Sequence, residues 1–308
     1  MLNVEGASYR FMSTFLIVNP AAGGGRAERA LPRVLEAARR HWGDVEVLTT
    51  SGPGDATALA RQAVGAERLI VVGGDGTIHE TANGLLSLEG VLPPLGTVPI
   101  GTGNDFVSLT GIGRGDPVRA IDRLAGGVIR RFDVGRAWGE YFVNSLGLGF
   151  DALVASHVPR YRWLRVGPLV YLAAVFRAYR GFRPPVLSVE ADGEVRTGPL
   201  FCIEVGIGVS AGGGFYLTPD ARPDDGVFDV CAVGPFGLWG FLTKMPRAFW
   251  GGHTTLKEVR MLRTARLRVR STEGPLLAHL DGELRRNGSD SIDITIEPGR
   301  LPVITVRG

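Results

Sequence analysis

A glycine-rich turn at residues 73–77, GGDGT, carries one carboxylate and one hydroxyl, the residue types that a phosphate site needs. The apolar run at 68–72 predicts a buried parallel strand before it, and residues 78–86 predict a helix after it. Glycines allow close backbone approach and positive φ, so successive N–H groups can form an anion nest near the helix N-terminus. Asp75 would be drawn toward a metal-bridged phosphate. A plain structural turn has the same composition and is the alternative.

Three further strand ends favour a ligand site at the same edge of the sheet. The sequence PIGTGNDF at 99–106 follows another apolar strand, NPAAGGG at 19–25 follows the first predicted strand, and Thr50 follows the second. Ligands of open α/β sheets bind at the carboxyl ends of the strands. Each turn alone could be a simple connection, but together they favour a nucleotide site.

The rhythm of the elements predicts two domains. Strands and helices alternate in the first part, which implies a parallel sheet with right-handed crossovers. Closely spaced β segments follow, as in antiparallel sandwiches and barrels. We predict an α/β plus all-β fold with an α/β nucleotide-binding domain at 13–131, a β-sandwich-like domain at 132–297, and the active site in the cleft between them. Residues 298–308 could return to the first domain.

The expected elements follow from the apolar periodicity. The predicted elements of the first domain are strands at 14–18, 45–49, 68–72 and 95–100 and helices at 26–42, 55–64 and 78–86. The later predicted strands are 141–146, 186–190, 200–209, 227–233, 267–270, 276–280, 292–296 and 302–306.

The composition excludes some functions. The chain has 308 residues, of which 44% are hydrophobic and 21% charged, with a formal charge of +3, as in a globular protein. Only Lys244 and Lys257 are lysines among the 34 basic residues. A Walker P-loop needs a lysine, so backbone amides, arginine and a divalent metal must supply the positive potential. The arginines are spread among acidic residues, which disfavours nucleic-acid binding. We expect Cys202 and Cys231 to be buried free thiols rather than a disulfide or metal site.

Any membrane contact is expected to be peripheral. No apolar stretch is long enough to span a bilayer, and residues 1–13 lack the apolar core of a signal peptide. We therefore expect a cytoplasmic protein associated with the inner face of the membrane. The segments 161–183 and 236–250 combine aromatic and basic residues around apolar faces, as an interfacial contact requires. A core-facing helix with a solvated arginine rim is the alternative, and an exposed aromatic surface would also suit a homodimer.

Several motifs stand in a specific order along nearly the whole chain: GGDGT at 73–77 with Glu80 and Asn83 in its helix, PIGTGNDF at 99–106, NSLGLGFD at 144–151, the acidic loop 220–230 and LDGE at 280–283. In this combination the chain resembles the bacterial soluble lipid kinases that contain the diacylglycerol kinase catalytic domain. No single motif is as specific as the set.

The resemblance implies that ATP binds between the domains. The positions that match the nucleotide-binding residues of the family are Asn19, Pro20, Ala21, Ala22, Gly23, Thr50, Gly73, Gly74, Asp75, Gly76, Thr77, Ile78, His79 and Thr102. These segments offer backbone N–H groups and small hydroxyls, which a triphosphate requires. His79 stands where relatives often carry Asn, so its contact with the nucleotide is left open.

The resemblance also implies the catalytic groups. Glu283 would take the proton from a lipid hydroxyl as that hydroxyl attacks the γ-phosphate, a reaction that asks the protein mainly for alignment and charge neutralisation. Asp75 is the candidate to position a catalytic Mg²⁺, directly or through water. A structural Mg²⁺ is implied at Asp225 with the backbone carbonyls of Arg222 and Val227. A simple hairpin at the Asp-Gly pair and a solvated acidic turn are the alternatives.

These features predict an ATP- and Mg²⁺-dependent lipid kinase that phosphorylates diacylglycerol or a similar lipid alcohol. Phosphatidylglycerol and sphingoid or ceramide-like alcohols are not distinguished. The nearest alternative is an NAD kinase, whose sheet carries a similar GGDGT turn; the NDF sequence at 104–106 and the aromatic segments favour the lipid kinase. A catalytically inactive nucleotide-binding regulator is the other alternative, against which Asp75 and Glu283 argue.

Overall fold

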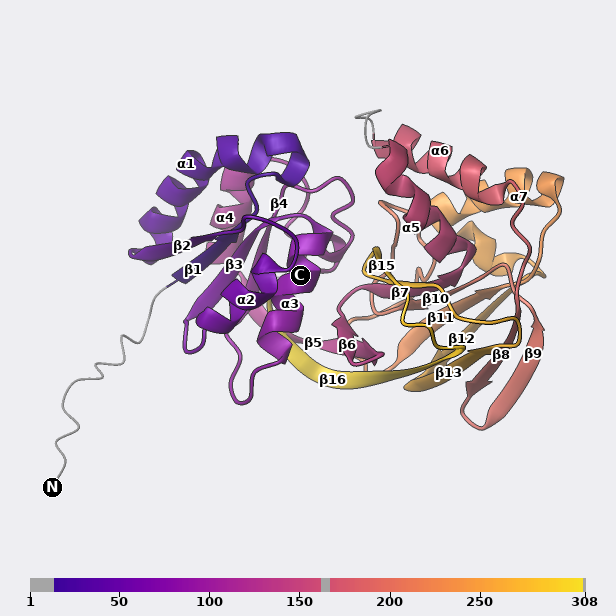
Figure 1. Ribbon diagram of the computed structural model, residues 1–308. Helices are drawn as coiled ribbons and strands as arrows, with labels where there is room; N and C mark the ends of the chain where they lie inside the picture. Colours follow the sequence, from indigo (N-terminus) through magenta and orange to yellow (C-terminus); the bar gives the residue numbers. More distant parts are fainter. Residues whose placement is uncertain (1–13, 162–166, 307–308) are drawn as a thin grey trace, which may run out of the picture.

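The chain folds into two lobes that are joined by long strands (Figure 1). The computed structural model describes residues 14–161 and 167–306. The elements of the N-terminal lobe are β1 (Thr14–Val18), α1 (Ala22–Trp42), β2 (Val45–Thr49), α2 (Asp55–Gln62), β3 (Arg68–Gly73), α3 (Asp75–Leu86), β4 (Leu95–Pro99), a 3₁₀ turn (Phe106–Leu109) and α4 (Pro117–Ala125).

The N-terminal lobe is a parallel sheet covered on both faces by helices. Strands β2, β1, β3 and β4 lie side by side in that order and are parallel. Along β3, Leu69 and Val71 pack in the core beneath α2 and α3, whereas Ile70 and Val72 pack in the core beneath α1 and α4. All four side chains are fully buried. A strand buried on both faces needs a continuous apolar run, and the predicted α/β lobe is confirmed.

The remaining chain forms most of the second lobe. Its elements are β5 (Val128–Ala137), β6 (Glu140–Phe142), β7 (Ser145–Gly149), α5 (Phe150–Tyr161), α6 (Gly167–Tyr179), β8 (Val186–Ala191), β9 (Glu194–Pro199), β10 (Cys202–Gly206), β11 (Phe228–Val233), α7 (Leu238–Lys244), 3₁₀ turns (Met245–Trp250 and Gly252–Thr255), β12 (Val259–Thr264), β13 (Arg266–Ser271), β14 (Ala278–Leu280), β15 (Glu283–Arg285) and β16 (Ser291–Thr305).

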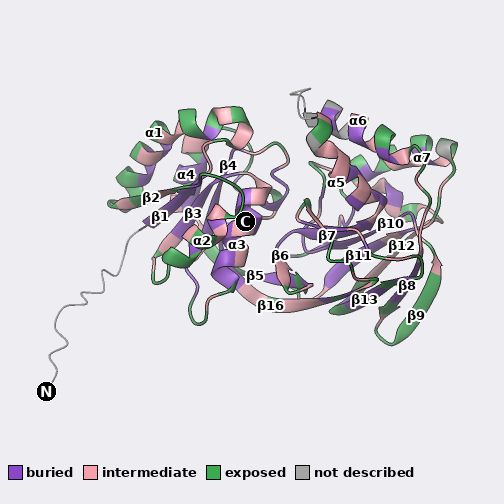
Figure 2. Cartoon of the chain, viewed as in Figure 1, coloured by how far each residue is buried: buried purple, intermediate pink, exposed green. Residues whose placement is uncertain are grey.

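The second lobe is a β-sandwich with a helical layer on one side. A six-stranded antiparallel sheet in the order β12-β11-β10-β7-β14-β15 packs against β8, β13 and β16 of the ten-stranded sheet. Ile203 and Val205 of β10 point into the sandwich core, and Cys202 points to the other face, beneath α5, α6 and α7. The two cores are the purple interior of this lobe in Figure 2. The predicted sandwich-like domain is confirmed, and both cysteines are buried free thiols.

Strand β16 passes through both lobes. It pairs with β13 in the second lobe and with β4 in the first, and β5 runs antiparallel to it along both halves. The sequence predicted two strands at 292–296 and 302–306, because Pro298 and Gly299 interrupt the apolar pattern between them. The structure accommodates this interruption as a register shift between the two halves of the β5–β16 pairing. One continuous strand therefore fixes the position of one lobe relative to the other.

A second difference lies near the domain junction. Residues 141–146 were predicted as one strand, but β6 ends at Phe142 and β7 begins at Ser145. Between them the backbone amides of Val143 and Asn144 donate to the carboxylate of Asp281 instead of to a neighbouring strand. A long-range side-chain contact thus ends a strand whose local sequence favours continuation.

Gly84 offers a test of the packing between α2 and α3. A Cβ atom added at Gly84 would lie 2.4 Å from the carbonyl oxygen of Thr57 and 2.7 Å from Ala60 Cβ. We expect Gly84→Ala to lower the free energy of unfolding by about 1–3 kcal/mol, because the backbone carbonyl has no room to move without separating the helices. Urea unfolding measures the change. Gly52→Ala is the control, since no atom lies within 4 Å of its Cβ position; equal stability of the two variants would contradict this packing.

Candidate functional site

The two glycine-rich turns of the first lobe are bonded to each other through Asp75. Its carboxylate accepts hydrogen bonds from the backbone amides of Asn104 (2.6 Å) and Phe106 (3.3 Å). The turns also approach closely, because a Cβ added at Gly74 would lie 2.9 Å from Gly101 Cα. Strands β3 and β4 are parallel neighbours, so both turns leave the sheet at the same edge. The sequence motifs at 73–77 and 99–106 therefore form one surface.

The surroundings of Asp75 disfavour its charged form. Burial and then the neighbouring Asp105 carboxylate raise the pKa of Asp75 to about 6, although its two amide hydrogen bonds act in the opposite direction. Both carboxylates flank Gly103: a Cβ added there would lie 2.8 Å from Asp75 Oδ2 and 3.5 Å from Asp105 Oδ2. Two acidic groups this close favour a positive ligand between or beside them.

The turn at 19–25 completes this edge. Asn19 donates from Nδ2 to the hydroxyl of Thr77 (3.0 Å) and accepts the amide of Ala21 (3.1 Å) at Oδ1. Gly23 has a φ of 61°, and a Cβ there would lie 2.4 Å from the carbonyl oxygen of Ile100. Only glycine therefore fits at position 23, where the turn at 19–25 contacts the turn at 99–106.

The other nucleotide-binding residues predicted from the sequence have varied settings. The backbone amide of Thr50 donates to Val18 at the end of β1, and Ile78 is buried beneath the turn. Thr102 is exposed beside Gly101 and Gly103. The structure thus brings the turn residues together at one edge, with Ile78 as part of the core below them.

Glu283 reaches this edge from the second lobe. It is the first residue of β15, and the turn before it has positive φ at both central residues, 51° at Asp281 and 87° at Gly282. That is the geometry of a two-residue hairpin, which the Asp-Gly pair favours. The exposed Glu283 side chain faces the glycine-rich turn at 73–77: a Cβ added at Gly76 would lie 2.8 Å from Glu283 Oε1. The hairpin interpretation and the candidate-site interpretation of residues 281–283 are therefore compatible.

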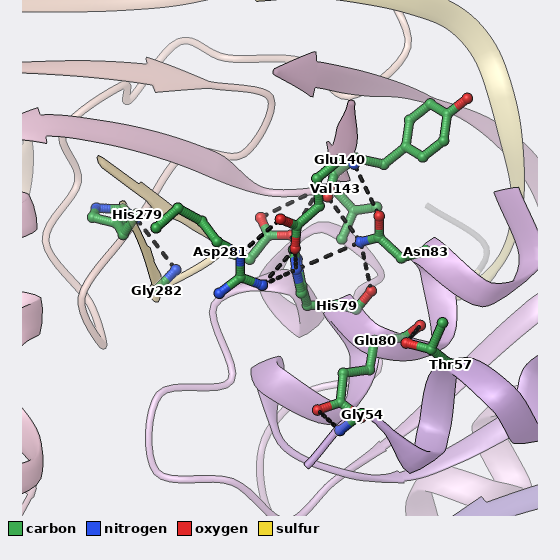
Figure 3. A network of polar contacts seen from close by, with 12 residues as sticks. Gly54, Thr57, His79, Glu80, Asn83, Glu140, Val143, His279, Asp281 and Gly282 are labelled. Carbon is green, nitrogen blue, oxygen red and sulfur yellow. Dashed lines mark hydrogen bonds and ion pairs between the residues drawn. The ribbon is translucent and has the colours of Figure 1, made fainter. Parts of the chain in front are cut away.

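A buried polar network holds the hairpin turn against α3 (Figure 3). The imidazole of His79 lies between the carboxylates of Asp281, 2.8 Å from Nδ1, and Glu140, 2.8 Å from Nε2. Asp281 also accepts the amides of Val143, Asn144 and Ser145. Both nitrogens of the His79 ring thus contact carboxylates of the network. Any contact of His79 with a ligand would have to come from its backbone.

The charges in this network stabilise each other. Burial alone would lower the pKa of His79, but its hydrogen bonds to Asp281 and Glu140 raise the pKa to about 9. Burial would raise the pKa of Glu140, whereas its bonds with His79 and Arg285 lower the pKa to about 2. At neutral pH the network therefore contains an imidazolium between two carboxylates.

Two other helix residues of the motif set the geometry of α3. The carboxylate of Glu80 accepts the amides of Gly54 (2.8 Å) and Ala56 (3.2 Å) at the start of α2. The amide side chain of Asn83 exchanges two hydrogen bonds, both 2.9 Å, with the backbone of Tyr141 in β6. These side chains attach α3 to α2 and β6 (Figure 3).

The acidic loop of the second lobe lies apart from this network. Asp225 forms an ion pair with Arg263, and its Oδ1 accepts the amide of Val227 (3.3 Å). Asp229 lies 3.5 Å from Arg263 Nε, and its buried Oδ2 has no hydrogen-bond partner among the described residues. Arg222 lines the same hollow. The loop thus places the carboxylates of Asp225 and Asp229 around the guanidinium of Arg263.

Comparisons with known proteins agree with the geometry. Residues 13–137 match the diacylglycerol kinase catalytic domain, and residues 144–305 match the YegS C-terminal NAD kinase beta sandwich-like domain. The chain is 33% identical over 270 residues to the diacylglycerol kinase of Bacillus subtilis (strain 168), covering 87% of this chain and 88% of that protein. It is 31% identical over 270 residues to the diacylglycerol kinase of Staphylococcus saprophyticus, with the same coverage. The chain belongs to the diacylglycerol kinase family.

Solved structures show the same fold at lower identity. A diacylglycerol kinase from Bacillus anthracis str. Sterne superposes with a TM-score of 0.73 at 23% identity, over 96% of this chain and 97% of that one. An NAD kinase from Archaeoglobus fulgidus in complex with ATP superposes with a TM-score of 0.56 at 15% identity, over 96% and 94%. Membership of the diacylglycerol kinase family makes the chain a phosphotransferase with an alcohol acceptor, as the sequence predicted.

Sequence reasoning missed several residues that the structure places around this candidate site. Asp281 was read only as part of a turn, and Asp105 only as part of a motif. Glu140 and Arg285 were not singled out at all, although Arg285 donates from Nε to Glu140 (2.6 Å) in the same network. The sequence did contain a hint for Asp281, because it stands two residues before the candidate base Glu283, and a carboxylate that becomes buried there needs hydrogen-bond donors. No local pattern marks Glu140.

The raised pKa of His79 predicts how stability changes with pH. A group whose pKa is higher in the folded protein stabilises the fold fully below its unfolded pKa, near 6.5, and loses that contribution as the pH rises through the folded value of about 9. We expect the wild-type protein to lose up to about 3 kcal/mol of unfolding free energy between these two pH values, and His79→Gln to lose much less. Urea unfolding at pH 6.5, 8 and 9.5 tests this. His41→Gln, at a partly exposed histidine, is the control; parallel pH curves for wild type and His79→Gln would refute it.

Proposed function

We propose that the protein is an ATP- and Mg²⁺-dependent lipid kinase that transfers the γ-phosphoryl group to the hydroxyl of diacylglycerol or a similar lipid alcohol. The observation that carries the proposal is the approach of Glu283 from the second lobe to Gly76 in the phosphate turn of the first. A base and a phosphate cradle that meet across a cleft supply the alignment that phosphoryl transfer needs.

Binding of the triphosphate rests on the turns at 19–25, 73–79 and 101–103. Their glycines let backbone amides approach phosphate oxygens, and α3 begins at Asp75, so its N-terminus points to the same edge. No lysine precedes Lys244, and Arg26 is held by the carbonyl oxygen of Gly101 (3.3 Å) beside the turns. Amides and arginine therefore provide much of the positive potential. The Archaeoglobus fulgidus relative in fold was solved with ATP, which is consistent with this assignment.

Two carboxylate clusters fit the divalent cations. Asp75 and Asp105 form a like-charged pair in which only Asp105 has a nearby cation among the described residues, Arg114 at 3.7 Å, and a Mg²⁺ ion beside them would neutralise charge on the phosphates. We assign Asp75 to position that ion, directly or through water. A structural Mg²⁺ is assigned to Asp225 and the backbone carbonyls of Arg222 and Val227. Asp220, Asp225 and Asp229 line one hollow there, and this concentration of carboxylates supports a cation at that loop, in competition with Arg263.

Glu283 acts as the general base in this proposal. Its carboxylate removes the proton of the lipid hydroxyl while the hydroxyl oxygen forms a bond to the γ-phosphorus, and the bond from that phosphorus to the β–γ bridging oxygen breaks. ADP leaves with the bridging oxygen, and the proton stays on Glu283 until solvent removes it. The neighbouring Asp281 cannot take this role, because His79 and backbone amides already occupy its carboxylate.

Replacing the base tests the assignment. We expect Glu283→Gln to lower lipid phosphorylation by about 10²–10⁴-fold, because the amide cannot accept the proton. Nucleotide affinity, measured by calorimetry, is expected to change little, since Glu283 faces the turn without holding it. Glu194→Gln is the matched control, because Glu194 lies exposed at the edge strand β9. Near wild-type turnover in Glu283→Gln would remove Glu283 from the mechanism.

The alternative acceptors can be separated by one assay. An NAD kinase-like activity would move labelled phosphate from ATP to NAD, and the shared fold with NAD kinases is the observation behind this alternative. A catalytically inactive regulator would bind ATP and label neither NAD nor lipid. We expect labelling of a lipid extract, with the product identified by mass.

The helical layer of the second lobe is our candidate for peripheral membrane contact. Among the described residues no helix is long and apolar enough to cross a bilayer. Trp239 and Trp250 are 79% and 68% exposed, and Phe249 and Phe176 are also exposed. Arg247 is exposed on the same 3₁₀ turn as Trp250. Exposed aromatics beside basic groups suit an anionic lipid surface. We therefore place the protein in the cytoplasm, in contact with the inner membrane face.

The two segments predicted to touch membrane or core contain both core-facing and exposed aromatic side chains. Phe241 and Tyr179 pack in the core beneath the helices, whereas Trp239 and Phe176 face outward. Residues 162–166 of the first segment lie outside the described residues. A homodimer through the same exposed aromatics is the competing proposal, and the following test separates the two.

Removing both tryptophans tests membrane contact. We expect the double variant Trp239→Ala/Trp250→Ala to bind phosphatidylglycerol-containing vesicles at least about tenfold more weakly, since each exposed ring would lose burial in the interface. Activity on a short-chain, monomerically dispersed diacylglycerol is expected to be kept. Val195→Ala, at an exposed position of β9, is the control. Unchanged vesicle binding together with dissociation of a dimer in sedimentation would favour the homodimer instead.

A further inference from the structure

A second polar cluster lies on the other side of the catalytic turn. His279 in β14 and Glu204 in β10 are both cross-strand partners of Gly147 in β7, and Asp151 reaches the same point from the first turn of α5. A Cβ added at Gly147 would lie 2.2 Å from His279 Nε2, 2.5 Å from Asp151 Oδ2 and 2.7 Å from Glu204 Oε2. The glycine leaves room for three side chains to converge above the sheet.

The hydrogen bonds of His279 define where its proton lies. The backbone amide of Gly282 points its hydrogen at Nδ1 (3.3 Å), so Nδ1 accepts. Nε2 then carries the proton and donates to Asp151. Burial lowers the pKa of His279, and the nearby carboxylates raise it, to about 9. The contact with Gly282 opposes this protonation, because a second proton on Nδ1 would face the amide hydrogen of Gly282. The contact with Gly282 therefore favours the neutral ring.

The same contact argues against a metal ion in this cluster. One ligand atom of each of Asp151, Glu204 and His279 lies within 4.8 Å of the others, a spacing that a cation could bridge. Coordination through Nε2 would require that nitrogen to lose its proton, and the proton would move to Nδ1, opposite the Gly282 amide. The hydrogen-bonded arrangement satisfies every group of the ring, and the metal-bound one does not.

We propose that Asp151 and His279 form a positioning pair that holds the Asp281–Glu283 turn, and with it the carboxylate of Glu283, at the phosphate site. Asp151 fixes the tautomer and orientation of His279, and His279 Nδ1 holds the amide of Gly282. This inference rests on the proposed role of Glu283 as base. It assigns to His279 no contact with either substrate.

The turn is then held from both sides. In the first lobe His79 binds the carboxylate of Asp281, and in the second lobe His279 binds the next amide along the chain, as Figure 3 shows for the bond between His279 and Gly282. Positive φ at Asp281 and Gly282 gives the turn a defined but easily altered geometry. Because displacement of a reacting group by about 1 Å can cost on the order of 10²-fold in rate, the second anchor has a catalytic consequence.

Glu204 supports the pair as a buried neutral group. It is 1% exposed, and its Oε2 lies 3.9 Å from His279 Nε2. Burial and then the charge of Asp151 raise the pKa of Glu204 to about 8. A protonated Glu204 leaves Asp151 as the anion that His279 faces, which keeps the orientation of the ring defined.

Two substitutions of His279 separate its two contacts. In His279→Asn the side-chain oxygen can occupy the place of Nδ1 and accept the Gly282 amide, whereas in His279→Gln the side-chain nitrogen can occupy the place of Nε2 and reach Asp151. We expect His279→Gln to lower kcat at least about tenfold more than His279→Asn, with the KM values for ATP and lipid little changed. Melting temperatures of both variants control for stability, and a merely structural histidine would give equal kcat values.

Two further measurements make the inference falsifiable apart from the proposed function. In a double-mutant cycle, His279→Gln is expected to add no loss to Glu283→Gln, because it acts through that carboxylate. The ¹⁵N resonances of the His279 ring are expected to show an unprotonated Nδ1. Loss of activity in Glu283→Gln with equal kcat in the two His279 variants would refute the positioning pair alone, as would Zn²⁺ binding that is abolished by Glu204→Gln. Full activity in Glu283→Gln would refute the proposed function itself.

Discussion

The carboxylate of Asp281 is the group on which the geometry of the site depends. It is 3% exposed, and a buried carboxylate is stable only when hydrogen bonds and a counter-charge offset its lost hydration. Its donors come from the connection between β6 and β7 and from His79 in α3. They converge only when the hairpin of the second lobe meets α3 of the first. The same meeting brings Glu283 against Gly76, so satisfaction of a structural charge and assembly of the candidate site are one event.

Other contacts across the lobes act in the same direction. Asp105, from the second glycine-rich turn, accepts the hydroxyl of Ser210 (3.1 Å) and the amide of Gly213 (2.7 Å) in the second lobe. Asp133 of β5 accepts the amides of Gly226 and Gly299, both at 2.7 Å, beside the register shift of β16. The joining strands fix the relative position of the lobes, and these carboxylates pin the loops near the junction. The loops that surround the candidate site are therefore held in place by contacts from both lobes.

What the sequence could predict was set by the range of each interaction. The parallel strands and the glycine-rich turns follow from local composition, because a turn residue or a buried apolar run can be recognised within a few positions. The candidate base Glu283 came from the family resemblance, since its local sequence alone predicts only a hairpin. The partners of His79 could not be found that way, since Asp281 and Glu140 are distant in the chain and nothing in their own neighbourhoods marks them. The prediction of one strand at 141–146 was wrong for the same reason, because the distant Asp281 binds the backbone between β6 and β7. The continuity of β16 was hidden by Pro298 and Gly299, which interrupt the local pattern.

Asp281 and Asp75, two aspartates of the candidate site, differ in how far their surroundings compensate their charge. Asp281 has backbone amides and an imidazolium as donors, and the charge it carries is fully compensated. Asp75 has two amides and a like-charged neighbour, and its pKa is raised to about 6. Its charge is therefore held at a cost to stability. Carboxylates under such tension concentrate at functional sites, because a cationic ligand can relieve what the protein leaves uncompensated. The first lobe contains no lysine, since the first lysine of the chain is Lys244 in the second lobe. The uncompensated charge of Asp75 would therefore attract a cation.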